Sequence, residues 1–130
     1  MMKTFETEED IRREKKAITT FVNVFGGSFQ KLDPRDIDYK IFDKDNNLIA
    51  YAEVVGRLKT MKTAYPLPVS LIKLSKLIQK RLNPLLIWSC DDGVIYAIAD
   101  NLNGSVSKPA TGELMVYYDI QKGLKYIRYT

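Results

Sequence analysis

The sequence contains no histidine and only one cysteine, Cys90. Without histidine, a Ser-His-Asp triad, a Cys-His pair and an HNH-type nuclease site are excluded, and so is a zinc site of Cys and His ligands. A lone cysteine cannot form a disulfide within the chain, so the sequence does not call for an oxidising compartment. Any acid–base or metal chemistry is therefore expected from Asp, Glu, Lys, Tyr or bound water.

Long apolar runs are also absent. No stretch reaches the ~18 apolar residues that a membrane span requires, and residues 1–16 are charged and lack the apolar centre of a secretory signal. We therefore expect a cytoplasmic protein without a membrane span. The chain has 130 residues, 45% of them hydrophobic and 28% charged, which suits a single globular domain covering residues 1–130.

Acidic residues are missing from the whole stretch between Glu53 and Asp91, although the chain contains 16 of them. The cations of the same stretch are Arg57, Lys59, Lys62, Lys73, Lys76, Lys80 and Arg81. Nucleic acid favours such a surface because binding releases the counterions of its phosphates. We expect these residues to contact nucleic acid; the alternative is a solvated, lysine-rich helix face beside a loop.

Residues 7–25 have the pattern of an amphipathic helix. Thr7 precedes three acidic residues, apolar residues recur at helical spacing from Ile11 to Phe25, and Gly26 follows the last of them. A second helix is expected over residues 70–82, where leucines lie on one side and lysines on another. Asn83 and Pro84 end it.

The remaining apolar segments alternate or run as strands do. We expect strands at residues 28–32, 36–42, 48–55, 85–90 and 94–99, with residues 36–55 forming a hairpin, loops at 56–67 and 100–112, and a C-terminal hairpin of residues 114–118 and 124–129. The segment 85–90 is almost entirely apolar, which is typical of a buried central strand. Together these elements predict an α/β fold in which helices flank a mixed central β-sheet.

Three carboxylates stand out against this pattern. Glu53 lies in an otherwise apolar strand, where a charge is costly unless it is paired, metal-bound or near water. Asp38 lies in the preceding strand, so a hairpin over 36–55 can bring the two carboxylates together, and such a pair suits Mg²⁺. Glu14 lies beside the apolar stripe of the first helix and either reaches the rim or a site in the sheet. The alternatives are a solvent-facing Asp38 and an ion pair between Glu53 and a nearby Lys or Arg.

These residues together resemble the PD-(D/E)xK nuclease superfamily, whose fold is restriction-endonuclease-like. The order matches over residues 7–100: a helix with Glu14, a strand with Asp38, a strand with Glu53, a basic helix with Lys73, then a buried strand. The resemblance implies cleavage of phosphodiesters with Mg²⁺ (or Mn²⁺). Asp38 and Glu53 would be metal ligands and catalytic residues, and Glu14 an outer metal ligand.

The chain departs from the superfamily pattern at Val55. The motif lysine stands two residues after the glutamate, on the same strand face, and this position holds valine. Lys40, which shares a strand face with Asp38, and Lys73 or Lys76 from the basic helix are the candidates to replace it. We expect Lys40 and Lys73 to take this catalytic role.

Three hypotheses of function follow. The first is a metal-dependent nuclease that hydrolyses DNA, with branched or single-stranded DNA as candidate substrates. The second is a nuclease-like protein that no longer cuts, and binds nucleic acid or inhibits an enzyme that handles it. The third is an assembly protein that uses the tyrosines of residues 116–118 and 126–129. A homodimer stays open in each case.

Overall fold

The computed structural model describes residues 7–33, 37–108 and 112–130. Helix α1 (Glu8–Phe25) confirms the predicted first helix. Thr7 caps it, because its hydroxyl accepts from the Asp10 peptide N–H at 3.0 Å and the Asp10 carboxylate accepts from the Thr7 N–H at 3.2 Å. Gly26 ends the helix in the left-handed conformation, with φ of 77°. The buried residues of α1 are Ala17, Ile18, Phe21 and Val22.

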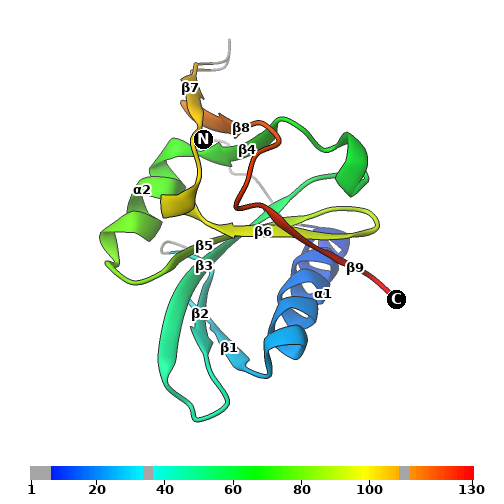
Figure 1. The fold of residues 1–130 in the computed structure, drawn as a ribbon, viewed down its shortest axis with the longest axis vertical. Coiled ribbons are helices and arrows are strands. Elements are labelled where there is room, and N and C mark those ends of the chain that lie inside the picture. Colours follow the sequence, from blue (N-terminus) through cyan, green and yellow to red (C-terminus); the bar gives the residue numbers. More distant parts are fainter. Residues whose placement is uncertain (1–6, 34–36, 109–111) are drawn as a thin grey trace.

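The central sheet has six strands in the order β1-β2-β3-β5-β6-β9 (Figure 1). Their bounds are β1 (Ser28–Lys31), β2 (Tyr39–Phe42), β3 (Leu48–Gly56), β5 (Pro84–Ser89), β6 (Gly93–Ile98) and β9 (Lys125–Arg128). β3 and β5 are parallel, whereas the other neighbours are antiparallel. The predicted α/β class with a mixed sheet is therefore confirmed.

The predicted hairpin of β2 and β3 is also confirmed, with Tyr39 opposite Ala52. The first strand of this hairpin was expected from residue 36, but β2 begins at Tyr39 and residues 34–36 lie outside the described residues. Asp38 therefore stands immediately before the strand. This position leaves its side chain free of the strict alternation of the ladder.

Helix α2 (Leu71–Gln79) is shorter than the sequence predicts. It begins at Ser70, whose hydroxyl accepts from the Lys73 peptide N–H at 3.5 Å. The helix stops before the predicted end at residue 82, and Arg81 has a left-handed φ of 57°. Leu74 and Leu77 are its buried residues, whereas Ile78 is 47% exposed.

A second sheet of three strands accounts for three wrong predictions. Strands β4 (Leu67–Ser70), β8 (Met115–Tyr118) and β7 (Ser105–Ser107) pair in that order. β7 and the 3₁₀ turn η1 (Met61–Thr63) lie within the expected loops. β4 lies at the junction of the expected loop 56–67 and the expected second helix, and the 3₁₀ turn η2 (Ala99–Asn101) lies at the start of the expected loop 100–112. The expected C-terminal hairpin is wrong, because β8 pairs with β4 and β7 while β9 pairs with β6.

The apolar residues of β8 and β9 explain this separation. Val116 and Tyr118 of β8 are buried in the cluster beneath α2, whereas Ile127 of β9 packs against the cluster beneath α1. A hairpin would have placed these side chains in one cluster. The chain instead completes two cores, one on each face of the central sheet.

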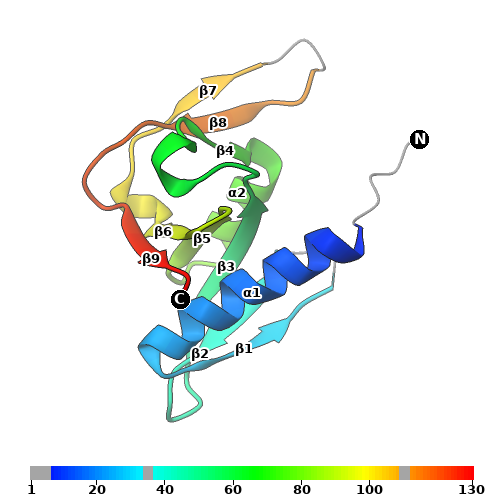
Figure 2. The same ribbon diagram turned by 90° about the vertical axis from the view of Figure 1, so that its right-hand side faces the viewer.

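The two helices cover opposite faces of the central sheet (Figure 2). Ala52 and Val54 of β3 face the α1 core, while Tyr51 and Val55 of the same strand pack against the α2 core. Trp88 is fully buried in the α2 core, and its indole N–H donates to the Pro68 carbonyl at 2.7 Å. Among the described residues, no helix combines the length and apolar character needed to cross a bilayer.

Candidate active site

Asp38 and Glu53 meet at the point where β2 begins. The β2–β3 register places Tyr39 opposite Ala52, and Asp38 and Glu53 are the residues next to these two. The Val54 peptide N–H donates to Asp38 Oδ2 at 2.8 Å, which fixes the Asp38 carboxylate against β3. The Asp38 side chain is 13% exposed and that of Glu53 is 2% exposed. The structure therefore brings together the two carboxylates that the sequence analysis paired.

Burial is the largest cause of a raised pKa in both groups, and a neighbouring carboxylate adds to it in each case: Asp38 for Glu53, and Glu14 for Asp38. For Glu53, burial has the largest effect and the Asp38 charge adds to it, so that its pKa rises to about 7 although Lys73 lowers it. Burial likewise raises the pKa of Asp38, against the Val54 N–H, which lowers it. Two adjacent buried carboxylates resist being ionised at the same time, so the pair favours a bound proton or cation.

Lys73 reaches the pair from α2. Its ammonium lies 3.2 Å from Glu53 Oε2, which is the ion pair that the sequence analysis held as an alternative for Glu53. Burial opposes the charged form of Lys73, but the carboxylates of Glu53 and Asp38 outweigh burial and raise its pKa. Lys73 is therefore a stable cation at neutral pH, held beside the carboxylates by a capped and packed helix.

The second oxygen of Glu53 has no such partner. Among the described residues, Glu53 Oε1 is buried and accepts no hydrogen bond. An unsatisfied buried oxygen of a carboxylate costs on the order of 1–3 kcal/mol, and more when it is charged. Such groups are expected where a cation or substrate completes the site.

Glu14 lies next to the pair, on the α1 side of the sheet. Its Oε2 accepts from the Tyr39 hydroxyl at 2.6 Å and from the Lys31 ammonium at 2.6 Å. Its charge contributes to the raised pKa of Asp38, so the two carboxylates influence each other electrostatically. The Glu14 side chain is 15% exposed and is fixed by these partners. Glu14 was expected either at the rim or at a site in the sheet. It lies neither at the open rim nor in contact with both Asp38 and Glu53.

Lys31 is a site residue that no sequence pattern indicates. Its ammonium lies 2.6 Å from Glu14 and 3.7 Å from Asp38 Oδ1. Residue 31 falls in a predicted strand, but nothing in its sequence context sets the pairing of this strand with β2. Lys31 is opposite Tyr39 in that register, which is what brings it to the carboxylates.

The carboxylates suit a metal only in part. No group of three or more Asp, Glu or Cys side chains within residues 7–33, 37–108 and 112–130 is arranged to hold a metal ion. The expected ligand set of Glu14, Asp38 and Glu53 is thus not assembled as one cage. Mg²⁺ commonly binds through one or two carboxylates and keeps several waters, so Asp38 and Glu53 with its unpartnered oxygen fit it. Mn²⁺ accepts the same oxygen ligands.

The two expected replacements for the motif lysine differ in the structure. Lys40 lies in β2 opposite Tyr51, and within the described part of the chain it makes no hydrogen bond or ion pair with the site carboxylates. Val55, at the position of the motif lysine, is half-buried against the α2 core. Of the two candidates, the structure brings Lys73 to the site and not Lys40.

The cations expected to contact nucleic acid have different surroundings. Lys59, Lys62, Lys76 and Arg81 are exposed, and the Lys80 ammonium lies 5.4 Å from the centre of the Tyr51 ring. Arg57 is the exception: its Nε donates to the Ala64 carbonyl at 2.8 Å and its Nη2 to the Pro66 carbonyl at 3.3 Å. Its guanidinium ties the loop after β3 in place, which favours a structural role for Arg57; the expected phosphate contact stays a prediction.

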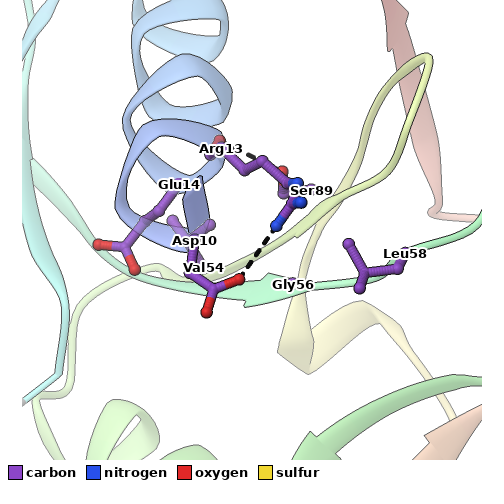
Figure 3. A pocket seen from close by; sticks show the side chains of 7 residues that line it. All are labelled: Asp10, Arg13, Glu14, Val54, Gly56, Leu58 and Ser89. Atoms are coloured by element: carbon purple, nitrogen blue, oxygen red, sulfur yellow. Dashed lines mark hydrogen bonds and ion pairs between the residues drawn. The ribbon is translucent and has the colours of Figure 1, made fainter. Parts of the chain in front are cut away.

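A cleft of about 290 Å³ on the α1 side is lined by Glu14. Figure 3 shows Asp10 and Glu14 projecting from the first turns of α1 above Val54 of β3, with Leu58 at the opposite end. Arg13 and Ser89 also line it, and the Arg13 guanidinium pairs with Asp10 at 3.0 Å. The cleft contains Glu14 and the residue whose N–H binds Asp38, but Asp38 and Glu53 themselves are not among the residues that line it.

The fold and the site define an α/β protein with a buried carboxylate pair flanked by two lysines. Comparisons of the chain with profiles of protein families, with curated proteins and with solved structures find no match.

Proposed function

We propose that the chain is a metal-dependent nuclease of the PD-(D/E)xK type, with a restriction-endonuclease-like fold, that hydrolyses phosphodiester bonds in DNA. The observation that carries the proposal is the pair formed by half-buried Asp38 and buried Glu53, with the Lys73 ammonium 3.2 Å from Glu53. The chain order agrees with the superfamily, since α1, β2, β3 and α2 contribute Glu14, Asp38, Glu53 and Lys73 in turn.

Asp38 and Glu53 would hold Mg²⁺ (or Mn²⁺), which when bound polarises the scissile phosphate and lowers the pKa of its water. Lys73, kept charged by its acidic neighbours, would orient the attacking water and stabilise charge on the phosphate. Glu14, held by Tyr39 and Lys31, would position the water network on the α1 side. The buried setting makes each of these interactions stronger than it would be in water.

The exposed cations of α2 and the preceding loop would bind the phosphate backbone. Lys59, Lys62 and Lys76 are exposed, and residues 54–90 contain no acid that would repel phosphate. Contacts of this kind carry little base specificity, which suits recognition of branched or single-stranded DNA by shape. They also make affinity depend steeply on salt.

The test is cleavage of plasmid and branched DNA with Mg²⁺ or Mn²⁺. Asp38→Asn and Glu53→Gln preserve shape and remove the charge that holds the metal, so each variant should lose cleavage by more than about 100-fold. Asp45→Asn, an exposed acid in the β2–β3 turn, is the matched control and should cut as the wild type does. Cleavage that persists in the Asp38 and Glu53 variants would refute the proposal.

Val55 supports a second candidate, a nuclease-like protein that binds nucleic acid or blocks an enzyme that handles it. In this case Lys73 is only the counter-ion of a buried carboxylate, and the chain binds DNA without cutting it. A salt titration of DNA affinity in the absence of cleavage would distinguish the two. Salt-dependent binding without turnover favours the binder, and no affinity at low salt favours an inhibitor that contacts protein.

A further inference from the structure

We propose that Lys31 competes with the divalent cation for Asp38, so that its ammonium leaves Asp38 and remains with Glu14 when the metal binds. The inference rests on the proposed function, since it concerns the same metal site. It assigns Lys31 a role in setting metal affinity, and so makes it a positioning residue in place of a simple surface cation.

The oxygens of the two ligands differ in what already faces them. Asp38 Oδ2 accepts from the Val54 N–H at 2.8 Å, so its other oxygen, Oδ1, is the more available one. Lys31 Nζ stands 3.7 Å from that Oδ1. Glu53 differs, because Lys73 pairs with Oε2 and leaves Oε1 without a hydrogen bond among the described residues. A metal can therefore reach Glu53 while Lys73 stays, but it meets the charge of Lys31 at Asp38.

Lys31 is held more closely by Glu14 than by Asp38. The ammonium lies 2.6 Å from Glu14 Oε2, within hydrogen-bond distance, whereas 3.7 Å to Asp38 is an ion pair without a hydrogen bond. The Tyr39 ring lies beneath the ammonium, 4.7 Å from the ring centre, and its hydroxyl holds the same Glu14 oxygen. Lys31 can thus give up Asp38 and keep its stronger partners.

The backbone of Lys31 is fixed while its side chain can move. The peptide N–H of the next residue, Leu32, donates to the Asp38 carbonyl at 2.9 Å, which ties the end of β1 to the start of β2. The Lys31 side chain is 46% exposed and lies on an edge strand, so a small change of its rotamers requires no repacking. The competition therefore lowers the affinity for metal without changing the backbone or the packing of the core.

As a consequence, the site should bind the metal weakly when no nucleic acid is present. A bound phosphate adds negative charge and oxygen ligands, which offsets the opposition of Lys31. Metal and nucleic acid would then load together, and the ammonium released from Asp38 would lie beside the incoming phosphate. Removing the Lys31 charge should uncouple the two by tightening metal binding in the absence of DNA.

The experiment is Mn²⁺ binding to the full chain without DNA, measured by electron paramagnetic resonance at moderate ionic strength. Lys31→Met removes the competing charge, and Lys40→Met removes an equal charge from the neighbouring strand β2. We expect K31M to bind Mn²⁺ about tenfold more tightly than the wild type, and K40M to stay within about twofold of it. Lys31→Arg keeps the charge and should not tighten binding.

The outcomes separate the inference from the proposed function. Equal affinities of K31M and K40M would overturn the competition while leaving the metal site intact. Unchanged binding in Asp38→Asn would show that the metal does not use this site, and the proposed function would fail with it. Should K31M not fold, Lys31→Gln and the Mn²⁺-induced rise in Tm give the same comparison, because ligand affinity raises stability.

Discussion

The ammonium of Lys73 lies 3.2 Å from the carboxylate of Glu53, across the boundary between α2 and β3. This contact supplies a lysine next to the glutamate although the strand itself carries Val55 two residues later. Since Glu53 is 2% exposed, the ion pair is shielded from solvent on the carboxylate side. The cation of the site is thus contributed by a helix and not by the strand.

Replacing Lys73 with methionine should abolish most of the cleavage. The substitution keeps the length of the side chain and removes the charge that we propose to orient water, and such groups contribute roughly 10²–10⁴-fold to rate. We expect kcat for DNA cleavage with Mg²⁺ to fall by at least about 100-fold, with KM changing little. Lys76→Met, on the next turn of α2, is the control and should mainly weaken DNA binding.

Restoring the lysine within the strand should rescue that loss. A lysine at position 55 would lie on the same strand face as Glu53 and could extend its stem along the half-buried surface toward the site. We therefore expect the double variant Lys73→Met/Val55→Lys to regain at least about tenfold of the lost activity, as a restored proton-transfer group does. Lys73→Met/Val55→Met has the same bulk without the charge, and rescue by it too would contradict the interpretation.

The raised pKa of Glu53 should make stability depend on pH. Its folded-state pKa of about 7 lies above its ordinary value of 4.5, so the folded chain keeps a proton that the unfolded chain loses between these two values. Below about pH 4.5, Glu53 makes its full contribution to the free energy of unfolding. This contribution falls as the pH rises to about 7. The loss amounts to roughly 3 kcal/mol for a shift of this size.

Glu53→Gln should remove this dependence. Urea unfolding without metal at pH 4.5 and pH 8 should show the variant gaining roughly 3 kcal/mol relative to the wild type at the higher pH. Asp45→Asn, an exposed acid, serves as the control and should show almost no difference. An identical stability difference at the two pH values would mean that folding does not raise the pKa of Glu53.

The sequence predicts those parts of the fold that local patterns determine. α1 is capped by Thr7 and Gly26 as expected, and the alternation of the 36–55 segment gives the hairpin that brings Asp38 to Glu53. The pairing of β8 and β9 with separate sheets could not be predicted, because short half-apolar strands fit many edges and tertiary packing selects among them.

The residues of the site could also be predicted only in part. Both carboxylates of the pair follow from strand pattern, and Lys73 follows from its helix, although Lys40 was an equal candidate. Lys31 could not be found, because its place depends on the β1–β2 register, which the sequence does not set. The carbonyl contacts of Arg57 could not be predicted, since only the three-dimensional path of the loop shows which carbonyls its guanidinium meets.

Arg57 and its lysine neighbours should therefore differ when they are replaced. Arg57→Ala leaves the carbonyls of Ala64 and Pro66 without their donor, and it should lower the free energy of unfolding by about 1–2 kcal/mol. The salt dependence of DNA binding should stay as in the wild type. Urea denaturation and a salt titration of affinity measure the two effects on the same variant.

The exposed lysines of this loop should show the opposite behaviour. Lys59→Ala/Lys62→Ala removes two exposed cations and should leave unfolding nearly unchanged. Because each phosphate contact contributes about 0.9 to the slope of log affinity against log salt, the slope should decrease by up to about 1.8 for duplex DNA. A slope that changes with Arg57 and not with the two lysines would mean that the guanidinium leaves the loop carbonyls to bind phosphate.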